Sequence, residues 1–244
     1  QMMRFTPLLA AFNTPDQTVT SLLFNGMIQF DPTGLPQPVL STSWGISRNG
    51  EVYNILLRQD AFWHDGEPVT TEDVLFTVEL LQSEDFPVQE DLQEFWREIE
   101  VEALDDYNLQ FRLPEPYAPF LDYLTFGVLP AHLLADLSTS EIVNGTFNLL
   151  PVGTGPFKFR ELITEGDRIT GVVLEKNPDF YGETAFFDQV EFVYFPDEEA
   201  IWEAYQAGEI QGIGEIPPAL LPEALQDPNL NLYTSRLPQM SIVF

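Results

Sequence analysis

The chain has 244 residues and carries 39 Asp and Glu against 10 Lys and Arg, which gives a net charge of −29. Such a surface repels phosphate backbones and anionic membranes, so nucleic acid is not expected as a partner. Cysteine is absent and only two histidines occur, which excludes disulfides, thiolate catalysis and Cys-bound zinc and leaves little for any other metal site. No stretch approaches the ~18 apolar residues that a membrane-spanning helix needs.

The first half of the chain predicts short elements separated by turns. Residues 17–30 have the pattern of an amphipathic helix, or of a helix that passes into a strand, and end at the turn DPTGLP. Residues 51–58 alternate as a strand with apolar side chains on both faces, which indicates a strand that is covered on both sides. Residues 99–104 and 108–113 alternate around DDYN and predict a hairpin with one face in water.

The middle of the chain predicts helices and then strands. Residues 118–126 and 129–137 have the pattern of two short helices, the second of which opens near Pro130. Residues 151–159 turn into a strand, and residues 169–176 form another.

The last part of the chain alternates between strands and helices. Residues 189–195 are apolar on both faces, which suits a central strand under helices. Residues 197–209 predict a helix with an acidic first turn that stops at Gly208. A helix at LPEALQ and strands at NLNLYT and MSIVF follow. Because strands follow helices more than once, the predicted fold class is α/β or mixed.

A stretch with several polar side chains raises the question of catalysis. His64, Asp65 and Glu67 lie close together, as in an acid/base pair or a metal site. Thr70 and Asp73 follow with the spacing of a capping box, ahead of apolar residues at helical intervals. No nucleophile accompanies the histidine, so we interpret the stretch as the start of a helix.

The same stretch resembles a known family. Residues 61–81, AFWHDGEPVTTEDVLFTVELL, follow a strand that ends in LR and are similar to a block of the family 5 extracellular solute-binding proteins. These are the oligopeptide- and dipeptide-binding components of ABC importers. Further blocks agree in the same order: LLFNGMIQFDPTGLPQPVLSTSWGIS, VEALDDYNLQFRLPEPYAPFLDYL, PVGTGPFKFRE with VVLEKNPDFYGE, and FDQVEFVYFPDEEAIWEAYQAGEIQGI. Together the blocks cover nearly the whole chain.

The resemblance implies a type II periplasmic-binding-protein fold, in which two lobes close on a ligand. Residues 1–25 and 150–244 would form a partial lobe I, and residues 26–149 would form an inserted α+β subdomain. Lobe II would be absent from this chain, which we expect to be an N-terminal fragment of a longer protein. The segment RFTPL departs from the family pattern at Thr6.

The resemblance also implies a function. The protein is expected to deliver peptides to the permease subunits of an ABC importer by cleft closure, as a monomer, with no catalytic residue, cofactor or metal. Its expected location is extracytoplasmic, either periplasmic or at the cell surface, with a lipid anchor as an option through a removed N-terminal segment. Oligosaccharides and metal complexes are alternative ligands, and a sensor or regulatory role is an alternative use of the fold.

The ligand cleft is expected to include residues near the N-terminus. Phe12, Asn13 and Thr14 fall where the family's first ligand loop lies. A helix-capping loop before Gln17 explains these three residues equally well.

Two later segments are also expected at the cleft. Gly214, Glu215 and Ile216 follow a predicted strand at GEIQGI, and a plain turn before Pro217 is the alternative explanation for them. Gln239 and Met240 lie on the strand that would cross to lobe II, where family members present backbone groups to the ligand.

The segment GTGPF resembles a phosphate-binding loop, but it lacks the lysine and the helix of a P-loop. Thr154 and Gly155 are therefore predicted to shape the start of a strand. A hydrolase with a carboxylate pair is the alternative from another functional class. No motif selects such a pair among the 39 acidic residues, so we predict a binding protein and not an enzyme.

Overall fold

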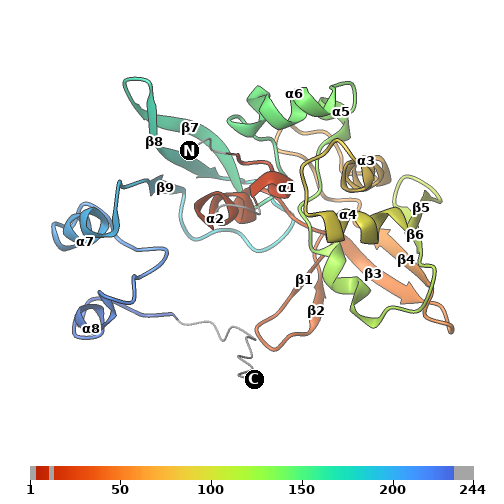
Figure 1. The fold of residues 1–244 in the computed structure, drawn as a ribbon, viewed down its shortest axis with the longest axis horizontal. Helices are drawn as coiled ribbons and strands as arrows, with labels where there is room; N and C mark the ends of the chain where they lie inside the picture. The colour runs from red at the N-terminus through yellow and green to blue at the C-terminus, as the bar shows by residue number, and fades with distance from the viewer. Residues whose placement is uncertain (1–3, 11–13, 234–244) are drawn as a thin grey trace. The chain divides into compact units, whose positions relative to one another are not determined.

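A computed structural model describes residues 4–10 and 14–233 of the chain (Figure 1). The chain divides into two compact units, Gln1–Val193 and Tyr194–Phe244. Among the described residues, the first unit holds three antiparallel sheets and most of the helices, whereas the second holds two helices.

The first unit begins with two helices and a small sheet. Helix α1 spans Pro7–Ala10 and α2 spans Thr14–Leu23, and the chain then enters strands β1 (Ile28–Phe30) and β2 (Pro36–Pro38). These two strands pair antiparallel across a turn in which Gly34 has a φ of 83°, a conformation that favours glycine. Of the two predictions for residues 17–30, a helix that passes into a strand is confirmed.

The first unit also contains a four-stranded sheet. It contains β3 (Ser41–Ile46), β4 (Val52–Leu57), β6 (Asn108–Arg112) and β5 (Glu100–Ala103), in that order and with every pair antiparallel. The hairpin predicted around DDYN is therefore confirmed as β5 and β6.

Strand β4 corrects one prediction. Tyr53, Ile55 and Leu57 are buried, but the side chains between them are not, and Leu56 is 38% exposed. The alternation was predicted correctly, but the strand is covered on one face only. The prediction failed because the sequence shows that a side chain is apolar but not whether a neighbouring element covers it.

Helices α3 (Thr71–Gln82) and α4 (Glu90–Arg97) pack against each other, and α3 also contacts β5. Trp96 on α4 is buried and meets the rings of Phe111, Phe120 and Phe126 in edge-on contacts with centroids 5.5 to 6.3 Å apart. Such an aromatic cluster supplies much of the buried apolar area that holds helix and sheet together.

The predicted short helices of the middle region are present. The first is a 3₁₀-helix, η1 (Ala118–Leu124), and the second is α5 (Ala131–Leu134), with Pro130 at its N-cap. Helix α6 (Thr139–Asn144) and the short 3₁₀-helix η2 (Thr146–Asn148) follow.

The third sheet contains β7 (Phe157–Glu165), β8 (Arg168–Lys176) and β9 (Gln189–Val193), in chain order and antiparallel. The strands predicted at 151–159 and 169–176 are therefore confirmed. The strand predicted at 189–195 is formed over residues 189–193, but it is not central in the described part of the sheet. Within the described residues β9 pairs with β8 alone, and its side chains alternate between exposed and half-buried. Its apolar residues thus lie at the edge of the sheet.

The second unit contains α7 (Glu198–Gln206) and α8 (Leu221–Ala224). The Asp197 carboxylate caps α7 by accepting from Ala200 N–H at 2.9 Å, and Gly208, with a φ of 75°, follows its end as predicted. The strand predicted at GEIQGI and the described part of the one predicted at NLNLYT are not formed, since a strand needs a paired neighbour and the described part of this unit offers none. The strand predicted at MSIVF lies outside the described residues.

Candidate ligand-binding region

The residues predicted to line a cleft are described only in part. Phe12, Asn13, Gln239 and Met240 lie outside the described residues. Thr14 is the first residue of α2, so the helix begins three residues earlier than the expected loop before Gln17 would place it.

The three remaining residues lie in the second unit. Gly214 and Glu215 form an exposed bend, and Ile216 beside them is half-buried. No heavy atom lies within 4 Å of the position that a Cβ on Gly214 would take. The bend therefore follows an irregular segment and not the predicted strand, and its backbone is open to solvent.

A close approach of two backbones marks the start of β7. The Gly155 N–H donates to the Leu23 carbonyl at the end of α2, at 2.8 Å. A Cβ on Gly153 would collide with the Leu23 carbonyl oxygen, and one on Gly155 would collide with that of Leu22. Glycine is therefore required at both positions so that this turn can lie against α2.

Thr154 between these glycines is fully buried and bonded to Asn25. The Asn25 N–H donates to the Thr154 hydroxyl at 3.2 Å, and that hydroxyl lies 3.3 Å from Asn25 Oδ1. The Tyr181 hydroxyl donates to the same Oδ1 at 2.8 Å. Thr154 and Gly155 thus shape the start of β7, as predicted, by fixing it to the segment after α2.

Asn177 and Arg58 complete this polar cluster. The buried Asn177 amide donates to the Gly155 carbonyl at 3.0 Å. The Arg58 guanidinium lies 3.8 Å from the centroid of the Tyr181 ring and pairs with Asp60 at 2.7 Å. Burial raises the pKa of the Tyr181 hydroxyl above its usual range, so the hydroxyl stays protonated and available as a donor.

His64 belongs to the same cluster. Its Nδ1 accepts from Gly153 N–H at 3.1 Å, and its Nε2 lies 3.1 Å from the Gly155 carbonyl oxygen. Burial lowers the pKa of His64 to about 4, so the ring is neutral at pH 7. Because both nitrogens are bonded to backbone groups, this histidine is placed to hold the turn and not to transfer a proton to a substrate.

The predicted helix start at Thr70 is confirmed, with Asp73 as its main partner. Thr70 is the N-cap of α3 and forms a capping box with Asp73, in which the Asp73 carboxylate accepts from Thr70 N–H at 2.9 Å. The same buried carboxylate accepts from Ala131 N–H at 2.9 Å and from the Trp63 indole at 3.2 Å. Asp73 therefore joins the start of α3 to two other segments.

The remaining side chains of the stretch have local partners. Asp65 pairs with His132 at 2.8 Å, and the Asp65 carboxylate also lies 3.3 Å from Glu67 N–H. Across residues 4–10 and 14–233, no three His, Asp or Glu side chains gather in a way that could hold a metal ion. In the same residues, no helix combines the length and the apolar character needed to cross a membrane.

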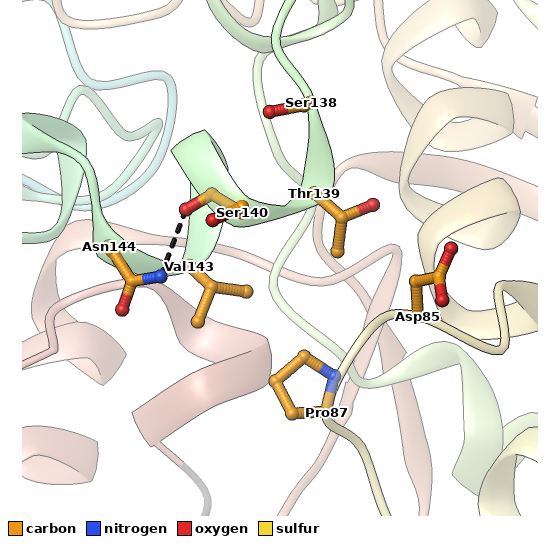
Figure 2. A pocket seen from close by; sticks show the side chains of 7 residues that line it. All are labelled: Asp85, Pro87, Ser138, Thr139, Ser140, Val143 and Asn144. Atoms are coloured by element: carbon orange, nitrogen blue, oxygen red, sulfur yellow. Dashed lines mark hydrogen bonds between the residues drawn. The ribbon is translucent and has the colours of Figure 1, made fainter.

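A surface pocket of about 500 Å³ lies between α6 and the turn after α3 (Figure 2). It contains none of the residues predicted to bind ligand, and two of its polar side chains have partners within the helix segment: Ser138 bonds to Glu141, and Asn144 bonds to the Ser140 carbonyl. Its lining residues are Asp85, Pro87, Ser138, Thr139, Ser140, Val143 and Asn144.

Residues 36–244 match the model of the bacterial extracellular solute-binding proteins, family 5 Middle. The chain belongs to this family. Membership agrees with the cluster described above, because Gly153, Thr154, Gly155 and Asn177 lie in the blocks that carry the resemblance.

The chain is similar to several named proteins and solved structures. Over 178 residues it is 33% identical to a putative ABC transporter peptide-binding protein of Brucella ovis. This alignment covers 70% of this chain and 32% of that protein. NikZ from Campylobacter jejuni, solved in complex with Ni(L-His), matches with a TM-score of 0.79 at 29% identity. The oligopeptide-binding protein AppA from Bacillus subtilis, solved with a nonapeptide, has the same fold, with a TM-score of 0.80 at 23% identity.

The two solved structures are each matched over 93% of this chain and 44% of their own length. The family 5 chain thus spans less than half of these relatives. The mixed arrangement of helices and antiparallel strands is that of part of a family 5 binding protein, which confirms the predicted fold class.

Sequence reasoning did not find the roles of His64 and Asn25. Each acts through partners that are distant in the chain, and the Gly155 carbonyl lies 91 residues after His64. No local spacing rule can report such a contact. The only usable signal was the pair of glycines in GTGPF, which indicated a close approach of some other backbone.

Proposed function

We propose that the protein is an extracytoplasmic solute-binding protein that delivers peptides to the permease subunits of an ABC importer. The observation that carries this proposal is the family match over residues 36–244, together with the 33% identity to a protein named as peptide-binding. The cluster around residues 153–155 supports a scaffold role, since its polar groups are used to join segments. The protein changes the location of its ligand and not its chemistry.

In the proposed mechanism the ligand lies between two lobes. Residues 1–25 and 150–244 contribute a partial lobe I, and residues 26–149 form the inserted subdomain. The second lobe belongs to a full-length protein that is as long as the relatives of this chain. Closure of the lobes removes the ligand from water, and the permease recognises the closed form. The protein acts as a monomer. A lipid anchor on a segment ahead of residue 1 would hold it at the cell surface.

The proposed ligand contacts come from three segments of this chain. An extended peptide of variable sequence is held mainly through its backbone and termini, which requires exposed N–H and C=O groups. The exposed backbone at Gly214 and Glu215 meets that requirement. The proposed contacts are Phe12, Asn13, Thr14, Gly214, Glu215, Ile216, Gln239 and Met240.

A metal complex is the second candidate ligand, because the 29% identical NikZ was solved with Ni(L-His). The experiment is mass spectrometry of the small molecules that the full-length protein carries from expression, followed by calorimetry with those molecules. Recovery of peptides supports the proposal, whereas recovery of a metal complex, or turnover of any ligand, contradicts it.

One substitution tests the backbone contact directly. In the full-length protein, Met240→Pro removes an N–H donor from the proposed crossing strand, whereas Gln239→Ala removes only a side chain. We expect the first to weaken peptide binding at least about tenfold, which corresponds to about 1.4 kcal/mol, and the second to change it little. Equal effects would show that the backbone of this segment does not bind the peptide.

A further inference from the structure

The His64 ring joins two parts of the first unit that are far apart in the sequence. Gly153 N–H, 89 residues later, donates to Nδ1, and the Gly155 carbonyl, 91 residues later, faces Nε2. One nitrogen therefore meets a donor and the other meets an acceptor. A neutral ring that carries its proton on Nε2 satisfies both partners, and no other protonation state does so.

The contact extends along the backbone. The His64 N–H donates to the Gly153 carbonyl at 2.8 Å, and the Lys158 ammonium on β7 donates to the His64 carbonyl at 3.2 Å. Together these bonds hold the loop of residues 62–68 against the turn at 153–155. The 153–155 turn also contacts the end of α2, because the Gly155 N–H donates to the Leu23 carbonyl.

A second proton on the ring would break this arrangement. It would place an N–H on Nδ1, directly opposite the N–H of Gly153, so that two donors would face each other with no acceptor between them. The charged groups around the ring act in opposite directions. Lys158 opposes a positive ring, and Asp65 favours one. Asp65 is itself paired with His132 at 2.8 Å, and Asp179 lies 3.8 Å from the Lys158 ammonium.

We propose that His64 is an acid-sensitive latch, which as a neutral ring holds the 62–68 loop to residues 153–155 and on protonation releases it. The inference concerns the fold of this chain and does not depend on the identity of the ligand. Burial holds the pKa of His64 near 4, below the value of about 6.5 for an unperturbed histidine. The folded-state pKa is therefore depressed. The latch contributes fully to the free energy of unfolding above pH 6.5, and this contribution is lost as the pH falls through about 4.

The first test is nitrogen NMR of the histidine rings in the ¹⁵N-labelled protein between pH 7 and pH 3. We expect His64 to be the neutral Nε2–H tautomer at pH 7 and to titrate near pH 4. A His64 ring that is charged at pH 6, or that carries its proton on Nδ1, would overturn the proposal. The chain has only two histidines, and His132→Gln assigns their signals.

The second test is amide exchange in the wild-type protein and in His64→Gln. A glutamine side chain can accept from Gly153 N–H and donate to the Gly155 carbonyl, but it cannot take up a proton in this pH range. At pH 3, one unit below the pKa, about a tenth of the wild-type rings remain neutral. We therefore expect the Gly153 amide to lose almost all of its protection in wild type at pH 3 but not in His64→Gln, and to be similarly protected in both proteins at pH 7.

The control amides are those of Leu57 and Leu113, which bond to backbone carbonyls of the four-stranded sheet region. They report global unfolding, so they measure the overall loss of stability that protonation causes, and the Gly153 amide should lose clearly more protection than they do. His132→Gln should keep the acid response of Gly153. If Gly153 is equally protected in wild type and His64→Gln at pH 3, or if its protection falls no further than that of the control amides, the latch does not exist.

Discussion

The Trp63 indole N–H donates to the Asp73 carboxylate at 3.2 Å, and both side chains are almost fully buried. This bond, with those from Thr70 and Ala131, gives the carboxylate three N–H donors. Burial raises the pKa of Asp73, because a charge is costly away from water, and the three donors offset part of that rise. The start of α3 therefore depends on a buried acid.

Asp73→Asn should destabilise the protein. The amide has one acceptor where the carboxylate has two, and its NH₂ group would face N–H donors. We expect a loss of about 2 kcal/mol in the free energy of unfolding, measured by urea denaturation, and about 1 kcal/mol for Thr70→Ala, which removes the smaller half of the capping box. The control is Glu72→Gln, which makes the same charge change on an exposed neighbour and should cost less than about 0.5 kcal/mol. Equal losses for Asp73→Asn and Glu72→Gln would contradict this account.

Gly155→Ala should destabilise the protein because its methyl group would meet the Leu22 carbonyl, a backbone group that cannot rotate away. Overpacking of this kind costs roughly 1–3 kcal/mol. Gly45→Ala is the matched control, since Gly45 lies on β3 with open space at its Cβ position and no positive φ. Thermal unfolding of the two variants measures the difference. A Gly155→Ala protein as stable as Gly45→Ala would show that the turn does not lie against α2.

Tyr181 should contribute through both its hydroxyl and its ring. Tyr181→Phe removes the bond to Asn25 and keeps the contact with Arg58, so we expect a loss of about 1 kcal/mol in the free energy of unfolding. Tyr181→Leu removes both and should cost a further 0.5–1 kcal/mol or so. Tyr233→Phe, at an almost fully exposed tyrosine, is the control and should be neutral. If Tyr181→Phe is also neutral, the hydroxyl bond is not a net stabilising contact.

The ligand affinity of this chain should be far below that of a full-length protein. If the peptide lies between two lobes, one lobe alone offers about half of the contacts, while association still costs several kcal/mol of lost freedom. Each 1.4 kcal/mol of lost contact is about tenfold in affinity. Calorimetry of both proteins with the same peptide pool measures the ratio. Equal affinities would place the ligand site wholly within the 244 residues.

Much of the fold could be predicted from the sequence, because short-range patterns determine helix starts, turns and alternation. The capping box at Thr70 and the stop at Gly208 depend on a few neighbouring residues and were predicted correctly. The exposed side of β4 and the edge position of β9 could not be predicted, since both depend on which element packs beside them. The roles of Asn25 and His64 were missed for the same reason.

The cluster around the 153–155 turn also bears on how the chain folds. Tyr181 and Asn25, which share a hydrogen bond, are 156 residues apart, so this contact can form only after a very long loop has closed. Loop closure of that length costs chain entropy before any contact compensates for it, and topologies with many such contacts fold slowly. The β4–β6 sheet and the β7–β8 hairpin have closer partners and can form earlier. We therefore expect the joining of α2 to the 153–155 turn to be a late step in folding, and the one that sets its rate.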